Sequence, residues 1–309
     1  MNYPIRLLII IISFPIYLAT FSVAYGQQNS QYTQYMYNTI TINPAYAGSR
    51  GMLSLNGLYR SQWVGLDGAP ETMNFSANTP VGVGKVGLGL SFVNDRIGPT
   101  ESYWVAADFA YTIRPNDVLK LSFGLKGGLN SYNLDVDKLN PDTSLDPNLF
   151  NINKISAIIG FGFYLHTEKW YVGLSSPNVL ETRYYDDVAT STASERAHFY
   201  LIGGYVFDLG SSVKFKPALL TKASSGSPLS VDLSANFLFN DKFTLGAAYR
   251  WGAAISGLAA FQISDQLMIG YAYDYDTTEL GNYNSGSHEI ILRFEFGRTV
   301  RRVVSPRFF

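Results

Sequence analysis

Three histidines are the residues of this chain best suited to metal binding or acid–base chemistry. They are His166, His198 and His288, and each falls on a different predicted strand or turn. Metal sites and general acid–base pairs need side chains that converge on one point. His288 and Glu289 are adjacent, but consecutive side chains of an extended strand point to opposite faces. The sequence therefore predicts no metal site and no catalytic residue in this set.

A second candidate for chemistry is the glycine-rich stretch that contains Gly82, Gly84 and Lys85. It lacks the spacing of a phosphate-binding loop and the Ser or Thr that follows the lysine, so a turn between strands is the better interpretation. Gly160 and Gly162 lie within one strand pattern, so we interpret them as glycines of a barrel strand and not as a nucleotide-binding fingerprint. The chain has no cysteine, which excludes disulfides, thiolate chemistry and lipid attachment at an amino-terminal Cys. We predict no cofactor and no enzyme activity.

Binding of another protein is the remaining chemistry that the sequence offers. Arg183, Tyr184 and Tyr185 lie in a long predicted connection, residues 176–197. Arginine and tyrosine are enriched among the hot spots of protein interfaces. A second long connection, residues 131–153, is expected at the same end of the fold. We predict that these two connections hold the site for a partner protein.

Composition indicates which fold must position these residues. Charged residues make up 15% of the 309 residues, against about 25% in soluble domains. Aromatic residues also make up 15%, with 22 Tyr and 20 Phe, and the net charge is −1. This combination favours a transmembrane β-barrel, whose alternating strands average out in hydropathy. A soluble β-sandwich is the alternative, but such domains run to about 100 residues. The near-zero net charge gives no field that would attract nucleic acid.

Residues 1–26 have the pattern of a secretory signal peptide. Arg6 supplies the positive charge, a long apolar run follows, and Ala24 and Gly26 place small residues before a cleavage point at Gln27. The alternative is a membrane anchor, because the apolar run is nearly long enough to span a bilayer. We predict that the mature protein begins at Gln27.

From Met52 onward, apolar and polar residues alternate with a period of two, as in half-buried β-strands. Within 119–129, one face carries Leu119, Leu121, Phe123, Leu125 and Leu129, and the other carries Lys120, Ser122 and Lys126. The pattern predicts an all-β fold, a transmembrane antiparallel barrel of about 14 strands. The expected strands are 52–60, 71–79, 85–93, 101–113, 118–130, 154–165, 169–175, 198–208, 212–222, 228–238, 242–250, 252–263, 267–275 and 287–296.

The predicted connections alternate between short and long, with one exception near Trp251. Outer-membrane barrels place short turns in the periplasm and long loops outside. An even number of strands then predicts that both termini are periplasmic. The expected divisions are the signal peptide 1–26, an N-terminal fingerprint segment 27–50, the barrel 51–296 and a basic periplasmic tail 297–309.

The fingerprint segment fits neither the strand pattern nor a helix. Its Tyr and Ile content is too apolar for a solvated tail, and Pro44 forces a change of chain direction after Asn43. We expect it to pack in or at the lumen of the barrel as a plug. The alternatives are a disordered arm and a docking arm outside the barrel. The candidate plug residues are Gln34, Tyr35, Met36, Asn38, Asn43, Pro44, Ala45, Tyr46 and Gly48.

These residues resemble the PorP/SprF family of type IX secretion system membrane proteins, whose members begin with a Gln-Tyr-Met-x-Asn segment and an Ile-Asn-Pro-Ala-Tyr-Ala-Gly-Ser run. Here the matching residues are Gln34 to Met36, Asn38 and Ile42 to Ser49, followed by Arg60, Gln62, Trp63, Pro70 and Thr72. Two later stretches, residues 94–99 and 175–178, are also similar to the family. The resemblance extends over essentially the whole mature chain.

The resemblance implies an outer-membrane protein of the secretion and gliding motility machinery. It would support the secretion or surface anchoring of large adhesins through their C-terminal sorting domains. The implied partners are the adhesin or its sorting domain, periplasmic components of the secretion system and outer-membrane lipid, but no nucleic acid. The alternative function is a passive uptake channel for small or apolar solutes, in which the long loops would narrow the pore.

Overall fold

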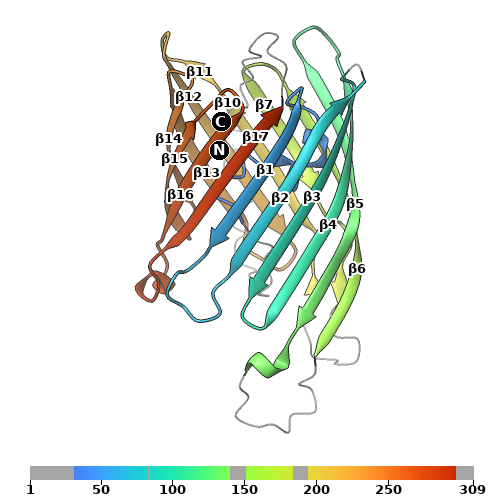
Figure 1. Cartoon of the computed structure of the whole chain (residues 1–309), viewed down its shortest axis with the longest axis vertical. Coiled ribbons are helices and arrows are strands. Elements are labelled where there is room, and N and C mark those ends of the chain that lie inside the picture. Colours follow the sequence, from blue (N-terminus) through green and yellow to red (C-terminus); the bar gives the residue numbers. More distant parts are fainter. Residues whose placement is uncertain (1–30, 83, 140–150, 184–193, 297–309) are drawn as a thin grey trace, which may run out of the picture.

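The fold is a closed antiparallel β-barrel, seen in a computed structural model that describes residues 31–82, 84–139, 151–183 and 194–296. Fourteen strands form the ring, which closes where β1 pairs with β17 and β10 pairs with β12 (Figure 1). No helix in the described part of the chain is long and apolar enough to cross a membrane. The predicted barrel and its number of strands are therefore confirmed.

The strands of the ring follow one another along the chain, and every pairing between neighbours is antiparallel. They are β1 Leu53–Ser61, β2 Glu71–Val81, β3 Val86–Ile97, β4 Thr100–Ile113, β5 Lys120–Leu134, β6 Ile152–His166, β7 Trp170–Ser176, β10 His198–Tyr205, β12 Val213–Ser224, β13 Ser230–Phe239, β14 Phe243–Arg250, β15 Ala254–Gln262, β16 Leu267–Asp276 and β17 Ser287–Phe296. Outside the ring, β11 (Phe207–Asp208) pairs with β12, and β8 (Thr182–Arg183) pairs with β9 (Ser194–Glu195).

The alternation read from the sequence sets which side chains face outward. On β5, Leu125 and Leu129 are 63% and 58% exposed, whereas Lys126 is 6% exposed and forms an ion pair with Asp108 of β4 at 2.8 Å. On β17, Leu292 is outward and Arg293 is buried. Outward leucines suit hydrocarbon, and inward charges must find partners because burying an unpaired charge is costly.

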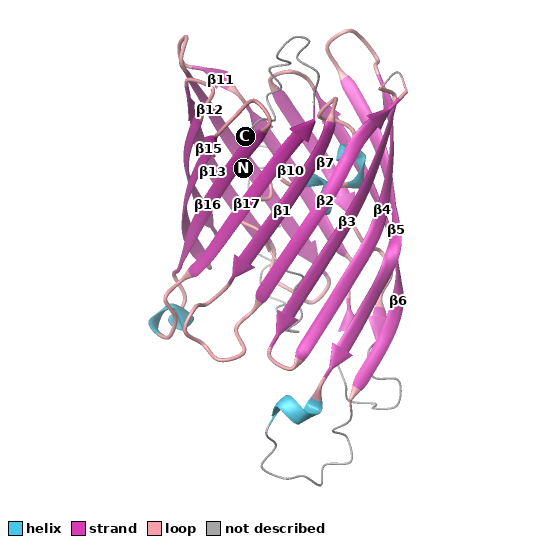
Figure 2. Cartoon of the chain, in the orientation of Figure 1, coloured by secondary structure: helices cyan, strands magenta, loops and turns pink. Residues whose placement is uncertain are grey.

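The two mouths of the barrel differ in their connections. One, the short-turn mouth, carries residues 82–85, 114–119, 167–169, 206–212, 240–242 and 263–266. The other, the long-loop mouth, carries 62–70, 135–151, 177–197, 225–229 and 277–286, and also the short connections 98–99 and 251–253. Figure 2 shows the 3₁₀ turns η3 (Val136–Leu139) and η4 (Glu279–Asn282) at the long-loop mouth.

Two connections at the long-loop mouth are shorter than the alternation predicted. Residues 94–97 continue β3, so the expected loop 94–100 reduces to a tight turn at Gly98 and Pro99. The polar residues there ended the alternation but not the pairing, since Asp95 accepts a hydrogen bond from Thr72 of β2 at 2.5 Å. β5 likewise runs on to Leu134. Loop length therefore alternates less regularly than the sequence suggested.

Aromatic side chains form a row on the outer wall near the short-turn mouth. The ring centroids of Tyr205 and Phe207 are 4.4 Å apart, those of Phe207 and Phe215 are 6.1 Å apart, and those of Phe215 and Phe237 are 4.8 Å apart. Aromatic girdles mark the level where a membrane barrel meets the headgroups. This row places the interface next to the short turns.

The interior holds residues 31–51, which we call the lumen segment. Two 3₁₀ turns, η1 (Thr39–Thr41) and η2 (Pro44–Tyr46), lie inside the wall of strands (Figure 2). η2 contacts β4, β5 and β6, and η1 contacts β2 and β3. One buried apolar cluster joins Tyr35, Met36, Ile40, Tyr46 and other side chains of the segment to residues from strands around the ring, among them Leu58, Tyr164, Tyr200, Leu220, Leu238, Leu258 and Ile291. The core of this protein is thus the lumen itself.

Replacing Leu125 with Arg tests the outward face of β5. We expect Leu125→Arg to lower the free energy of unfolding by about 2–4 kcal/mol if the site lies near the bilayer midplane. Leu121→Arg, close to the short-turn end of the strand, is the matched control and is expected to cost about 0–1 kcal/mol. Urea unfolding of the protein in lipid vesicles measures both costs. Equal costs at the two sites would contradict this placement of the bilayer.

Candidate functional site

The candidate functional site is the surface of the lumen that holds the lumen segment. At the long-loop mouth, Arg60 of β1 forms ion pairs with Asp274 at 2.7 Å and with Glu289 at 3.2 Å. Glu289 also accepts the backbone N–H groups of Thr33 and Gln34, at 2.9 and 2.7 Å. The Thr33 hydroxyl donates to Asp274 at 2.7 Å. We call Arg60, Asp274 and Glu289 the Arg60 clamp.

The Arg60 clamp is buried on all sides, with each side chain less than 5% exposed. A buried carboxylate is tolerated only when charge and hydrogen bonds compensate for lost water. Here the guanidinium supplies the charge and the backbone of the lumen segment supplies two more donors to Glu289. Barrel and segment therefore complete each other's hydrogen bonding at this end of the lumen.

Farther along the segment, Asn38 binds β2. Its side-chain Nδ2 donates to Oδ1 of the Asn74 side chain at 2.7 Å, and its Oδ1 accepts from the Ser76 hydroxyl at 2.7 Å. The donor and the acceptor of the Asn38 side chain are thus both used, which fixes the position of the segment along β2.

The Asn43–Pro44 bend is anchored to β6 and β7. Asn43 has an extended backbone, with φ −139° and ψ 106°, as expected before a proline. Its side chain accepts from Ala45 N–H at 3.0 Å and donates to the carbonyl of Phe163 at 3.0 Å. The Ser175 hydroxyl donates to the carbonyl of Ile42 at 2.7 Å. Pro44 opens η2, where its fixed φ is compatible with a helical turn.

Glycines in the wall leave room for this bend. A Cβ on Gly124 would overlap the backbone of Pro44 and Ala45, and a Cβ on Gly162 would overlap the side chain of Asn43. A Cβ on Gly87 would overlap the backbone of Ala47. At Gly124 and Gly87 the close neighbour is backbone of the lumen segment, and at Gly162 it is the Asn43 side chain.

A second charged cluster holds the segment at the short-turn mouth. Arg50 forms a buried ion pair with Glu295 of β17 and donates from Nη2 to Oε2 at 3.0 Å. Arg293 lies 4.0 Å from the same carboxylate, and its guanidinium lies over the Tyr37 ring at 5.7 Å from the centroid. We call Arg50, Arg293 and Glu295 the Arg50 clamp. The lumen segment is thus held at both mouths and along its length.

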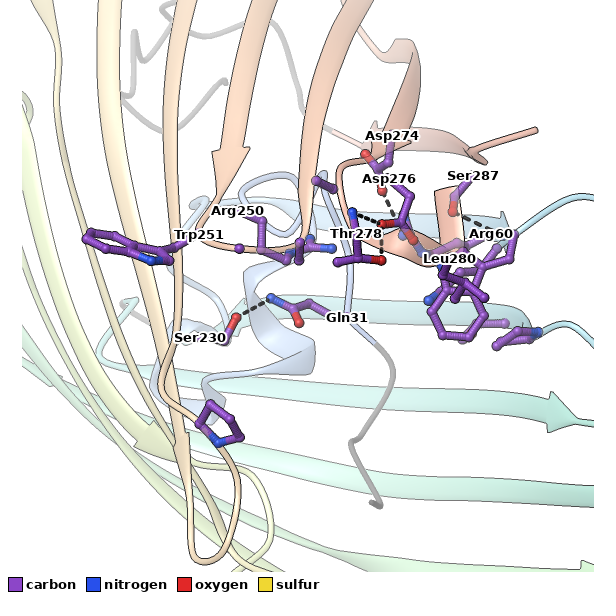
Figure 3. A pocket seen from close by; sticks show the side chains of 18 of the residues that line it. Gln31, Arg60, Ser230, Arg250, Trp251, Asp274, Asp276, Thr278, Leu280 and Ser287 are labelled. Carbon is purple, nitrogen blue, oxygen red and sulfur yellow. Dashed lines mark hydrogen bonds and ion pairs between the residues drawn. The ribbon is translucent and has the colours of Figure 1, made fainter. Parts of the chain in front are cut away.

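Above the Arg60 clamp, the long-loop mouth opens into a cavity of about 580 Å³, which we call the vestibule (Figure 3). Gln31 lies in its lining and donates to Ser230 at 3.1 Å and to Asp232 at 2.6 Å. Arg250 pairs with Asp232 at 2.7 Å. The beginning of the described chain therefore borders a polar, charge-paired cavity.

The structure buries eight of the nine candidate plug residues in the lumen and leaves Gly48 half-buried. Of the candidate partner residues, Arg183 lies in β8 opposite Ser194, and Tyr184 and Tyr185 lie outside the described residues. The sequence did not identify Arg60 as a barrel residue that binds the segment, or Gln31 as a segment residue that binds the barrel. The signal that could have found Arg60 is a charge on the inward face of a strand, in register with Glu289 of β17.

The stretch after β1 ties two long-loop connections together. Gln62 N–H donates to the carbonyl of Pro70 at 2.9 Å. Trp63 takes a positive φ of 51°, unusual for a residue with a side chain, and its N–H donates to the Ser287 hydroxyl at 3.1 Å. Val64 N–H donates to the carbonyl of Gly286 at 2.9 Å. These hydrogen bonds hold the loop 62–70 against the loop 277–286.

Comparison with known families identifies this arrangement. The sequence model of the type IX secretion system membrane protein family PorP/SprF matches residues 24–294. The chain belongs to the PorP/SprF family. It is therefore a membrane component of type IX secretion with the barrel fold of outer-membrane proteins, and its family is not an enzyme family.

Several solved outer-membrane proteins are similar to this chain in structure, at low sequence identity. The CymD monoaromatic hydrocarbon channel has a TM-score of 0.50 and 14% identity, with 89% of this chain and 96% of that chain covered. The Acinetobacter baumannii outer membrane protein Omp33 has a TM-score of 0.49 and 8% identity over 79% and 98% of the two chains. A Pseudomonas aeruginosa FadL homologue has a TM-score of 0.45 and 13% identity over 89% and 96%. No curated protein sequence matches the chain.

Proposed function

We propose that this PorP/SprF member is a non-enzymatic outer-membrane component that supports the secretion or surface anchoring of large adhesins through their C-terminal sorting domains. The short-turn mouth faces the periplasm, where other components of the secretion system bind, and the long-loop mouth faces outside. Family membership supports the secretion role, and the aromatic row beside the short turns suits a membrane interface.

The observation that carries the proposal is the occupied lumen. The lumen segment contributes to one apolar core with strands around the ring, and the Arg60 and Arg50 clamps hold its two ends. A passive uptake channel needs a continuous open path through the barrel, whereas a buried apolar cluster occupies this interior. The barrel is therefore better suited to present binding surfaces at its two mouths than to conduct solutes.

The partner site is assigned to the connections 135–151 and 177–197 at the long-loop mouth. Hydrogen bonds hold the base of the second connection, residues 177–197. The Asn178 side chain accepts from Ile159 N–H at 3.3 Å and from Leu180 N–H at 3.1 Å. Its two arms meet where Arg183 pairs with Ser194. This geometry allows the distal part to be removed without moving β7 or β10.

Deleting residues 184–193 and joining Arg183 to Ser194 through Asn-Gly is expected to abolish adhesin display on the cell surface. The two ends already face each other across an antiparallel pair, so a two-residue turn closes them. Adhesin on intact cells, measured by antibody binding, is the readout. The control replaces the exposed residues Ser211 and Ser212 in a short turn with Asn-Gly. Normal display after the loop deletion, with the barrel assembled, would contradict the assignment.

A further inference from the structure

The two ends of the lumen segment lie at opposite mouths of the barrel. At its far end, Gly48 N–H donates to Asn78 near the end of β2 at 3.2 Å, and Arg50 pairs with Glu295 near the end of β17. Both strands end at the short-turn mouth, where β1 begins two residues after Gly51.

At the near end of the segment, Gln31 and Thr33 bind the opposite mouth. Gln31 binds Ser230 and Asp232, the first and third residues of β13, which follows the connection 225–229. Thr33 binds Asp274 near the end of β16 and Glu289 near the start of β17. Gln31, Ser230 and Asp274 line the vestibule at the long-loop mouth. The chain therefore crosses the lumen once before its first strand begins.

The residues before Gln31 cannot return to the short-turn mouth through the lumen. Tyr35, Tyr37 and Ile40 fill the interior behind Gln31, each less than 5% exposed. A mature chain that begins at Gln27 has four residues before Gln31, which span at most about 14 Å when fully extended. A nine-residue strand such as β1 is about 30 Å long at roughly 3.3 Å per residue. Four residues are therefore too few to reach the short-turn mouth from Gln31.

We propose that the mature amino terminus emerges through the vestibule, on the same side of the membrane as the long loops. The sequence had predicted both termini on the short-turn side, because an even number of strands returns the chain to its starting side. The even number of strands counts only the crossings made by the barrel wall. The lumen segment crosses from one mouth to the other once more, inside the barrel. The start of the chain then lies at the same mouth as the connections that follow β5 and β7.

Single cysteines introduced into this cysteine-free chain test the proposal. The variants are Gln28→Cys, Tyr283→Cys at the long-loop mouth and Ser211→Cys at the short-turn mouth; Tyr283 and Ser211 are exposed. Each is expressed as the full-length protein in its native membrane and treated with a membrane-impermeant biotin maleimide, before and after the cells are opened. Mass spectrometry of the purified protein first verifies that the chain begins at Gln27.

On intact cells, we expect Gln28→Cys and Tyr283→Cys to give the same labelling result and Ser211→Cys to give the opposite one; in opened cells all three should be labelled. A result for Gln28→Cys on intact cells that matches Ser211→Cys and differs from Tyr283→Cys would overturn the proposal. Protection of Gln28→Cys in both preparations would also overturn it, because a chain leaving an open mouth is accessible to the reagent. The comparison is between mouths, so it holds whichever mouth faces outside and is independent of the adhesin assay.

Discussion

Removing residues 27–46 is expected to turn a closed barrel into a conducting pore. The deletion removes the buried tyrosines and the Asn43–Pro44 bend, which contact the wall around the ring. The inward face that remains carries Lys126, Asp108, Arg293 and other charges that water would hydrate. Planar bilayers should show stable stepwise conductance with the deletion and little or none with the intact protein. Retaining residues 47–51 keeps Arg50 and the start of β1 in place.

A thiol probe in the lumen gives a second readout of the same change. Lys126→Cys places a cysteine at an inward position that is 6% exposed in the intact barrel. We expect it to react slowly with a water-soluble maleimide in the full chain and quickly in the deletion variant. Leu125→Cys, which faces outward, is the control and should respond equally in both. A deletion variant that conducts no more than the intact protein would mean that residues 27–46 do not plug the barrel, and would favour a docking arm outside it.

Much of this architecture is predictable from the sequence because a barrel in lipid must alternate strictly. Each outward position faces hydrocarbon and each inward position faces the lumen. An apolar residue such as Leu292 is therefore predicted to face outward, and a charged residue such as Arg293 inward. The alternation becomes less informative at the strand ends beyond the membrane, where Asp95 and Arg96 are polar but remain paired. This is why β3 and β5 extend farther than the pattern predicted.

The site was less predictable for a different physical reason. The aromatic content of Tyr35 and Tyr46 indicated that the segment must be buried, but not the direction in which it runs. The direction of the segment depends on which of its residues bind which charged residues of the strands. Glu289 binds the backbone of Thr33, and Glu295 binds the side chain of Arg50. Nothing in their spacing distinguishes these two glutamates, so only the three-dimensional structure shows that the segment enters at one mouth and leaves at the other.

Replacing Gly124 with alanine is expected to destabilise the lumen segment specifically. The added Cβ would overlap the backbone of Pro44 and Ala45, and backbone inside a packed lumen can shift only by moving the whole bend. We expect Gly124→Ala to lower the free energy of unfolding by about 1–3 kcal/mol, the usual cost of overpacking a core. Bilayer recordings should show intermittent conductance, because the bend also fills the part of the lumen next to β5 and β6.

Gly127 provides the matched control, since it lies on the same strand and a Cβ there would meet nothing within 4 Å. Gly127→Ala is expected to change the unfolding free energy by no more than about 0.5 kcal/mol, as for ordinary surface substitutions. The decisive comparison repeats both substitutions in the protein that lacks residues 27–46. If Gly124 is small because the lumen segment passes it, the cost of Gly124→Ala should disappear in that background, since coupling between two changes requires contact. A cost that persists without the segment would mean that Gly124 serves the wall of the barrel alone, and that the segment lies against the wall without depending on it.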